Sequence, residues 1–212
     1  MRYSTEDLDN NEEFTKIAEV PYSELVAFIF KYLKNVTFVT FSFWAFCAIS
    51  LLLAIVIRIN IPSGLTVFLH SLLGFILMPV LVIPLHELLH IIPYYLTGAR
   101  NIRTGMDLKQ FFFYVTAHRY VAGPAQFILV ALIPFLVISL ALIILIIGLS
   151  GDWKWSLSAF LFVHTTMCAG DVALINFYFL NRKKKIYTWD DADEKVAYFY
   201  EKKGLDGERA KR

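Results

Sequence analysis

Long apolar runs alternate with short polar segments along most of this 212-residue chain. A helix needs roughly 20 apolar residues to cross the hydrocarbon core of a bilayer. Three runs reach that length, at about 36–57, 65–96 and 121–149, and a fourth extends from about 157 to 180. The pattern predicts an all-α integral membrane protein with about four transmembrane helices.

The second run is too long for one upright crossing, and it contains Pro84. Proline removes a backbone hydrogen bond from a helix interior, and an over-long apolar helix has to tilt or bend. We therefore expect this helix to be tilted, kinked or divided near Pro84.

The segment from Gly98 to Tyr120 joins the second and third runs and combines basic residues with an aromatic run at 111–115. It predicts a short cytoplasmic hairpin or re-entrant loop between these spans. Within it, residues 109–121 suit two roles equally well. They can offer a strand edge to an unwound substrate, or they can anchor the chain in the membrane interface.

The composition favours burial in lipid over burial in a soluble core. Hydrophobic residues make up 58% of the chain and the mean hydropathy is +0.58, which is more apolar than a soluble domain of this size. The net charge is only +2, and the basic residues stand beside apolar runs instead of forming a stripe. We therefore expect the lipid bilayer as a partner and no nucleic acid.

Lysine and arginine are distributed unequally about the apolar runs. Ten lie beside one set of run ends, and only Arg58 and Lys154 lie beside the other. Because these residues are retained preferentially on the cytoplasmic side, the bias predicts an even number of spans with both termini in the cytoplasm. The ten are Lys31, Lys34, Arg100, Arg103, Lys109, Arg119, Arg182, Lys183, Lys184 and Lys185.

Ionisable residues interrupt the second run as His86, Glu87 and His90, in a His-Glu-x-x-His pattern. Residues four apart share a helix face, so the two imidazoles can bind one Zn²⁺ while Glu87 acts as general base on its water. Each ionisable group at membrane depth costs about 2.5–3.5 kcal/mol on insertion scales. That cost favours a catalytic metal site over the alternative, hydrogen-bonded packing residues in an inert protein.

A third zinc ligand has to come from elsewhere in the chain. His90 lies ten residues before Arg100, and Asp171 lies eleven before Arg182. At the rise of an α-helix, both are then roughly 15–16 Å from the cytoplasmic helix ends. Asp171 is therefore the favoured third ligand.

Two neighbours of Asp171 remain open as contributors to the site. His164 is seven residues earlier on nearly the same helix face, so it suits a hydrogen-bonding partner of a ligand, an oxyanion donor or the third ligand itself. Cys168 is a weaker candidate as a thiolate ligand, because a small buried apolar role is the commoner one for such a cysteine.

The chain divides into three expected parts. Residues 1–35 form a cytoplasmic N-terminal segment, residues 36–181 a transmembrane metallopeptidase domain, and residues 182–212 a cytoplasmic tail. The part of the tail from residue 186 onward mixes acidic and basic residues around Val196 and Phe199, and it predicts a short helix with a frayed end.

The residues described above resemble a family of bacterial membrane zincin peptidases of uncharacterised function, which is distantly similar to the site-2 intramembrane metalloproteases. The resemblance runs from about Leu65 to Leu180. It rests on the motif at residues 86–90, Gly98 with the basic segment after it, Gly123-Pro124 at the start of the third span, and Gly170-Asp171 in the last.

The resemblance implies a zinc-dependent peptidase with His86, His90 and Asp171 as ligands and Glu87 as the base. The chain departs from the site-2 proteases at one point. Those enzymes carry an Asn-Pro-Asp-Gly type of motif around the carboxylate, whereas this chain has Ala-Gly-Asp-Val at residues 169–172. We therefore expect its substrate positioning to differ.

The predicted function is zinc-dependent hydrolysis of a membrane protein or peptide substrate in a bacterial cell membrane. Two other functions remain open. One is a non-proteolytic membrane protein with a structural zinc site, and the other is a proton-coupled carrier that uses the same ionisable residues as a relay. The sequence does not give the oligomeric state.

Overall fold

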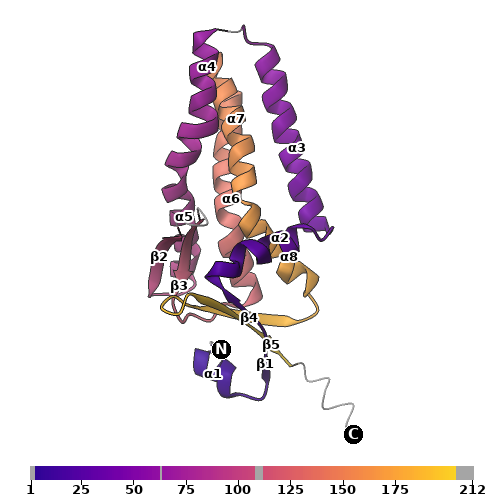
Figure 1. Ribbon diagram of the computed structural model, residues 1–212, viewed down its shortest axis with the longest axis vertical. Coiled ribbons are helices and arrows are strands. Elements are labelled where there is room, and N and C mark those ends of the chain that lie inside the picture. The colour runs from indigo at the N-terminus through magenta and orange to yellow at the C-terminus, as the bar shows by residue number, and fades with distance from the viewer. Residues whose placement is uncertain (1–2, 63, 108–111, 204–212) are drawn as a thin grey trace.

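The computed structural model describes residues 3–62, 64–107 and 112–203. Its helices form an elongated bundle, and two small β-sheets lie at one end of this bundle (Figure 1). Both the N-terminal and the C-terminal segments lie at the end that carries the sheets.

The bundle consists of four long helical passes. They are α3 (Phe38–Ile59), the continuous stretch α4 (Leu65–Leu72), η2 (Leu73–Leu77) and α5 (Met78–Leu96), then α6 (Pro124–Gly148), and finally α7 (Asp152–Met167) with α8 (Ala169–Leu180). The first three passes are each long and apolar enough to cross a membrane. The fourth is bent by 44° between α7 and α8 and would complete a set of four if it crosses as one broken span.

The prediction of an all-α protein is wrong, because the described residues form five β-strands in two antiparallel sheets. Strands β1 (Phe14–Pro21), β4 (Lys185–Asp191) and β5 (Val196–Lys202) pair in the order β1-β5-β4. Strands β2 (Ile102–Asp107) and β3 (Phe112–Ala117) form a hairpin between α5 and α6.

The predicted C-terminal helix is wrong for the same reason. Its residues form β4 and β5, while the frayed end predicted after them lies outside the described residues. In β5, Ala197 and Phe199 are buried. This alternation has the period of a strand. However, β5 is the central strand of the sheet only because it also pairs with β1, which lies near the other end of the chain. No local pattern encodes that pairing.

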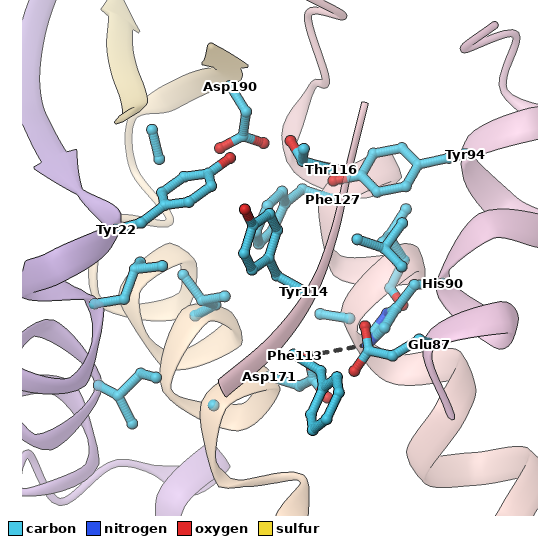
Figure 2. Close-up of a pocket in the computed structure, with 18 of the residues that line it drawn as sticks. Tyr22, Glu87, His90, Tyr94, Phe113, Tyr114, Thr116, Phe127, Asp171 and Asp190 are labelled. Carbon is cyan, nitrogen blue, oxygen red and sulfur yellow. Dashed lines mark hydrogen bonds and ion pairs between the residues drawn. The ribbon is translucent and has the colours of Figure 1, made fainter. Parts of the chain in front are cut away.

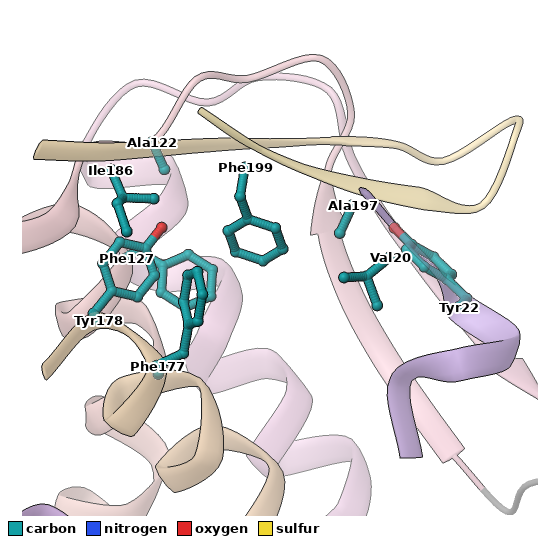
Figure 3. Close-up of a cluster of buried hydrophobic side chains, with 10 residues drawn as sticks. Val20, Tyr22, Ala122, Phe127, Phe177, Tyr178, Ile186, Ala197 and Phe199 are labelled. Atoms are coloured by element: carbon teal, nitrogen blue, oxygen red, sulfur yellow. The ribbon is translucent and has the colours of Figure 1, made fainter. Parts of the chain in front are cut away.

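The three-stranded sheet packs on the end of the helical bundle through aromatic residues (Figure 3). The Phe199 ring of β5 lies 5.0 Å from the ring of Phe177 in α8. It also stacks with Phe28 of α2 (Leu25–Leu33), at 5.9 Å between ring centroids. Burial of these rings removes a large apolar area from water and fixes the sheet against the helices.

The remaining N-terminal elements are short. Helix α1 (Thr5–Asn10) precedes β1, and a 3₁₀ turn, η1 (Tyr22–Glu24), joins β1 to α2. Helix α2 has no fully buried residue, and its Lys31 stands in its last turn.

The wide turn in the second pass lies earlier than expected. The chain is helical through Pro84, and the irregularity is the π-helical segment η2, where the Met78 amide donates to the Leu73 carbonyl. Pro79 lies two residues after the end of this segment. Because proline has no amide hydrogen and its ring clashes with the carbonyl four residues earlier, Pro79 accounts for the wider turn.

The π-helical segment also marks a close backbone approach. Gly74 within it is buried against α7, where an added Cβ would clash with the backbone carbonyl oxygen of Ser156. We expect Gly74→Ala to destabilise the bundle by about 1–3 kcal/mol, because backbone atoms cannot move aside as a flexible side chain can. Thermal unfolding of the purified protein in detergent measures this loss.

Gly148→Ala is the matched control, because a Cβ at that position meets no atom within 4 Å. Its melting temperature should stay within about a degree of the wild type. Equal melting temperatures for both variants would contradict the close approach of η2 to α7.

Candidate metal centre

Two imidazoles project from one face of α5. His86 and His90 are one helical turn apart, their side chains are 9% and 11% exposed, and their ring centroids are 5.0 Å apart. Helix α5 packs against α6 beside this face. Burial of two imidazoles without hydrogen-bond partners would be unfavourable in free energy. The groups around each ring therefore indicate its role.

Helix α8 brings a carboxylate to the same point. The Oδ2 atom of Asp171 lies 3.3 Å from His86 Nε2, and its Oδ1 atom lies 3.5 Å from His90 Nε2. These separations are long for charge-assisted hydrogen bonds. Two ligand atoms that share a tetrahedral zinc ion at normal bond lengths are about 3.3–3.4 Å apart. The three residues therefore fit a single divalent metal ion.

The hydrogen bond behind His90 orients its ring for this role. His90 Nδ1 lies 3.0 Å from the carbonyl oxygen of Val130 in α6. A carbonyl can only accept, so Nδ1 carries the proton and Nε2 presents its lone pair toward Asp171. His86 Nδ1 is buried and has no hydrogen-bond partner among the described residues.

A polar contact farther along α8 holds Asp171 in place. Asn176, one turn beyond Asp171, is fully buried. Its Oδ1 accepts a 2.6 Å hydrogen bond from the Thr37 hydroxyl, and its Nδ2 donates to the Tyr32 carbonyl at 2.7 Å. Thr37 is the N-cap of α3. The contact therefore ties α8 to the start of α3 and to the end of α2.

The bend at Cys168 separates α7 from α8, and α8 starts two residues before Asp171. His164 and Cys168 lie beside the site on this side. The His164 ring is 5.7 Å from the His86 ring, and its Nε2 lies 3.7 Å from the Cys168 sulfur.

The described residues thus offer two groups of donors that share His86. Besides the group with His90 and Asp171, His164 and Cys168 also lie close enough to it for one ion. Both of these residues are fully buried, and neither lines the adjoining cavity. A catalytic metal needs a position open to water or substrate, so the group with Asp171 is the better fit.

The cavity beside these ligands has a volume of about 380 Å³ (Figure 2). His86, Glu87, His90 and Asp171 line one part of it. The Glu87 side chain extends from α5 toward the same space as the ligands. The structure therefore places a free carboxylate beside the candidate metal position.

The wall of the cavity includes the β2–β3 hairpin, in the segment that the sequence predicted to be a hairpin or a re-entrant loop. Residues 113–116 of β3 all line it, together with Tyr22 and the β4 residue Asp190. Strand β3 pairs with β2 on one edge, and within the described residues no strand pairs with its other edge along 113–116. The site is thus enclosed by helices and by both sheets.

Asp190 is the residue of this cavity that the sequence did not reveal. Burial raises its pKa to about 6, and the hydroxyls of Thr116 and Tyr22 beside it offset part of that rise. Its segment was expected to be a short cytoplasmic helix. No local signal places a carboxyl there, because the position depends on the pairing of β4 with β5 and on the contact of the sheet with η1.

A third group of donors, His118, Asp191 and Asp193, lies between the two sheets. Its atoms already have partners. The Asp191 carboxylate accepts from the Arg119 guanidinium and from the amides of Asp193 and Glu194, and His118 Nδ1 accepts from the Ala192 amide. These hydrogen bonds stabilise the β4–β5 turn, and this structural role accounts for the clustering of the three residues.

Residues 79–187 match the sequence model of a family described as "Putative zincin peptidase". The matched region covers just over half of the chain, from the start of α5 to β4, and it includes every residue of the candidate metal centre. No curated protein and no solved structure matches the chain.

The raised pKa of Asp190 makes a prediction about stability. Between its ordinary value of 3.8 and about 6, the folded protein holds a proton that the unfolded chain has released, so stability falls as pH rises through this range. Asn cannot ionise. We expect Asp190→Asn to match the wild type near pH 4 and to be more stable near pH 8, by about 1–3 kcal/mol.

Thermal unfolding in detergent at several pH values between these limits measures the difference. Glu194→Gln removes an exposed carboxyl from the neighbouring turn and should show no such trend. A stability difference between Asp190→Asn and wild type that does not vary with pH would show that this carboxyl does not titrate in the folded protein.

Proposed function

Because the chain belongs to the zincin peptidase family, we propose that it is a zinc metallopeptidase embedded in the membrane, which hydrolyses peptide bonds of membrane-associated substrates. One observation carries this proposal. The ligand atoms of His86, His90 and Asp171 lie within 4.8 Å of one another, each imidazole is 3.3–3.5 Å from one Asp171 oxygen, and the group adjoins a cavity that Glu87 also lines.

The donor set suits a catalytic zinc ion. Two neutral imidazoles and one carboxylate are a common set of protein ligands, and they leave a fourth position toward the cavity. Zinc in this position would lower the pKa of a bound water and polarise the carbonyl of the scissile bond. The Val130 carbonyl keeps the His90 ring in the tautomer that such binding needs.

Glu87 supplies the proton transfers. Its carboxylate takes a proton from the attacking water, the new C–O bond forms at the substrate carbonyl, and the same carboxyl then gives its proton to the leaving amine as the C–N bond breaks. Glu87 therefore ends each cycle as it began. Its neighbours on α5 are the ligands themselves, so the helix fixes the spacing between base and metal.

The substrate lies along β3 in this proposal. The edge of residues 113–116 that faces the cavity offers backbone amides and carbonyls to an extended chain. Peptide bonds within a transmembrane helix are shielded by their own hydrogen bonds, so the substrate has to unwind before it is cut. Pairing with β3 would replace part of that lost hydrogen bonding.

The sheet end of the molecule faces the cytoplasm in this proposal. The apolar passes run from the sheets to the opposite end and back, and both termini lie at the sheet end. The same end carries the run of basic residues at 182–185, which favours the cytoplasmic side of a bacterial cell membrane. Water would then reach the metal from the cytosol through the cavity.

Metal analysis tests the ligand set. We expect about one zinc per chain in detergent-purified wild type, a loss of at least about tenfold in affinity in His86→Ala, His90→Ala and Asp171→Ala, and wild-type content in His164→Ala. The last variant is the matched control, since it removes a buried imidazole next to the site. Zinc loss in His164→Ala with retention in Asp171→Ala would assign the metal to the other donor group.

If the folded wild type binds no zinc after zinc is supplied again, this result would contradict the proposed peptidase function and favour a proton relay. In such a relay, the same four ionisable residues would titrate without a metal.

Glu87→Gln separates catalysis from a structural zinc site. We expect this variant to retain zinc and to lose about a hundredfold or more in peptide cleavage, because the amide cannot accept the proton. Mass spectrometry of a peptide mixture incubated with each zinc-loaded protein measures the cleavage. Glu6→Gln, at an exposed position of α1, should cleave as the wild type does. Equal cleavage by Glu87→Gln would exclude Glu87 as the base.

A further inference from the structure

The cavity that holds the metal ligands continues to a second polar group. At its other end, the Asp190 carboxyl stands beside the Tyr22 hydroxyl (Figure 2). Thr116 of β3 also contacts this carboxyl. Asp190 comes from β4 and Tyr22 from η1, so both sheets and the N-terminal segment have to assemble before this end of the cavity exists.

Strand β3 connects the two ends. Phe113 stands at the end with Glu87 and Asp171, and Thr116 stands at the end with Asp190. Three residue steps along a strand span about 10 Å. A substrate chain that lies extended along this wall would therefore reach from the metal to Asp190 with about three of its own residues.

The cavity has an excess of negative charge. Its lining contains three carboxyls, Glu87, Asp171 and Asp190, and no lysine or arginine among the described residues. In the proposed function, Asp171 binds the metal and Glu87 acts as the base. The nearest guanidinium of the turn, that of Arg119, is bound to Asp191 instead. Within the described part of the chain, Asp190 has hydroxyl neighbours but no cationic partner.

The walls around Asp190 suit the apolar stem of a long basic side chain. The Tyr22 and Tyr114 rings meet edge to face at 4.9 Å near Asp190 (Figure 2), and Phe199 also lines the cavity. Aromatic faces attract cations and pack against the methylene groups of lysine and arginine. The charged end would then meet the carboxyl.

We propose that Asp190 is a subsite for a cationic group of the substrate, about three residues from the bond that is cut. The group is the side chain of a lysine or arginine, or a free amino terminus. This inference rests on the proposed peptidase function. It specifies which substrates that site selects.

The ionised form of the Asp190 carboxyl is unfavourable in the free protein, because burial disfavours its charge. A bound cation would remove that cost, because an ion pair in a poorly solvated site stabilises the ionised carboxylate. A cationic group of the ligand would therefore bind more favourably beside Asp190 than a neutral group.

Peptide hydroxamates test the subsite without turnover. A hydroxamate group binds zinc directly, so acetylated peptides that end in this group are anchored at the metal. In one series, a single lysine moves from the second to the fourth residue from the hydroxamate, and norleucine replaces it in the matched series. A shorter, unacetylated norleucine peptide places its free amino group at the third residue. Calorimetric titration of the zinc-loaded full-length protein gives each affinity.

We expect a gain of roughly tenfold or more for lysine over norleucine at the third residue. The gain should fall to about twofold or less in Asp190→Asn and persist in Glu194→Gln. A gain with lysine only assigns the subsite to side chains, and a gain with the free amine only assigns it to amino termini. Zinc content and melting temperature of each variant confirm that it is folded and loaded.

The wild type alone can overturn the inference. Equal affinity for the lysine, norleucine and free-amine peptides at every position would exclude a cation subsite, as would a gain that persists in a folded Asp190→Asn. In either case, binding of the hydroxamates would still support the peptidase site. Zinc-loaded protein that binds none of them would instead overturn the peptidase proposal, and the inference with it.

Discussion

The meeting of the Asp171 carboxylate with the imidazoles of His86 and His90 is the contact on which the rest of the structure depends. It joins α8 to α5 at a buried point, where three polar side chains without a common partner would be costly. Several features of the fold maintain it. The bend at Cys168 directs the start of α8 toward α5, Asn176 ties α8 to the start of α3, and the Val130 carbonyl fixes the ring of His90.

The β-sheets at one end of the bundle enclose part of the cavity beside this centre. Without β3, the cavity beside Glu87 would lack one wall, and without β4 and η1 it would have no second polar end. The three-stranded sheet joins the two ends of the chain through β1 and β5 and is held to the helices by the rings of Phe28, Phe177 and Phe199. The described N-terminal and C-terminal segments are therefore part of the site's enclosure, although the candidate metal ligands lie on α5 and α8.

The chemistry of the cavity is graded along its length. Near α5 and α8 it contains imidazole and carboxylate groups that suit a metal ion and proton transfer, and near β4 it contains a carboxyl with two hydroxyl neighbours. Between them, the backbone of β3 offers hydrogen-bonding groups to an extended chain. In the proposed function, such an arrangement would separate the selection of a substrate from its hydrolysis, because different side chains would serve each purpose.

The apolar passes and the candidate metal-binding motif follow from the amino-acid sequence alone, because both are local. A run of about 20 apolar residues has to be buried wherever it lies, and two histidines four residues apart share a helix face in any helix. Asp171 followed from the cost of a lone carboxylate and from its depth. The three-stranded sheet and the position of Asp190 emerge only in the tertiary structure, whereas a hairpin at the place of β2 and β3 was one of two structures predicted from the sequence. Strand β5 pairs with a strand from the opposite end of the chain, and Asp190 enters the cavity only once that pairing has formed. Short strands with charged residues resemble an exposed helix until their partners are known, since their stability comes from distant contacts and not from the local sequence.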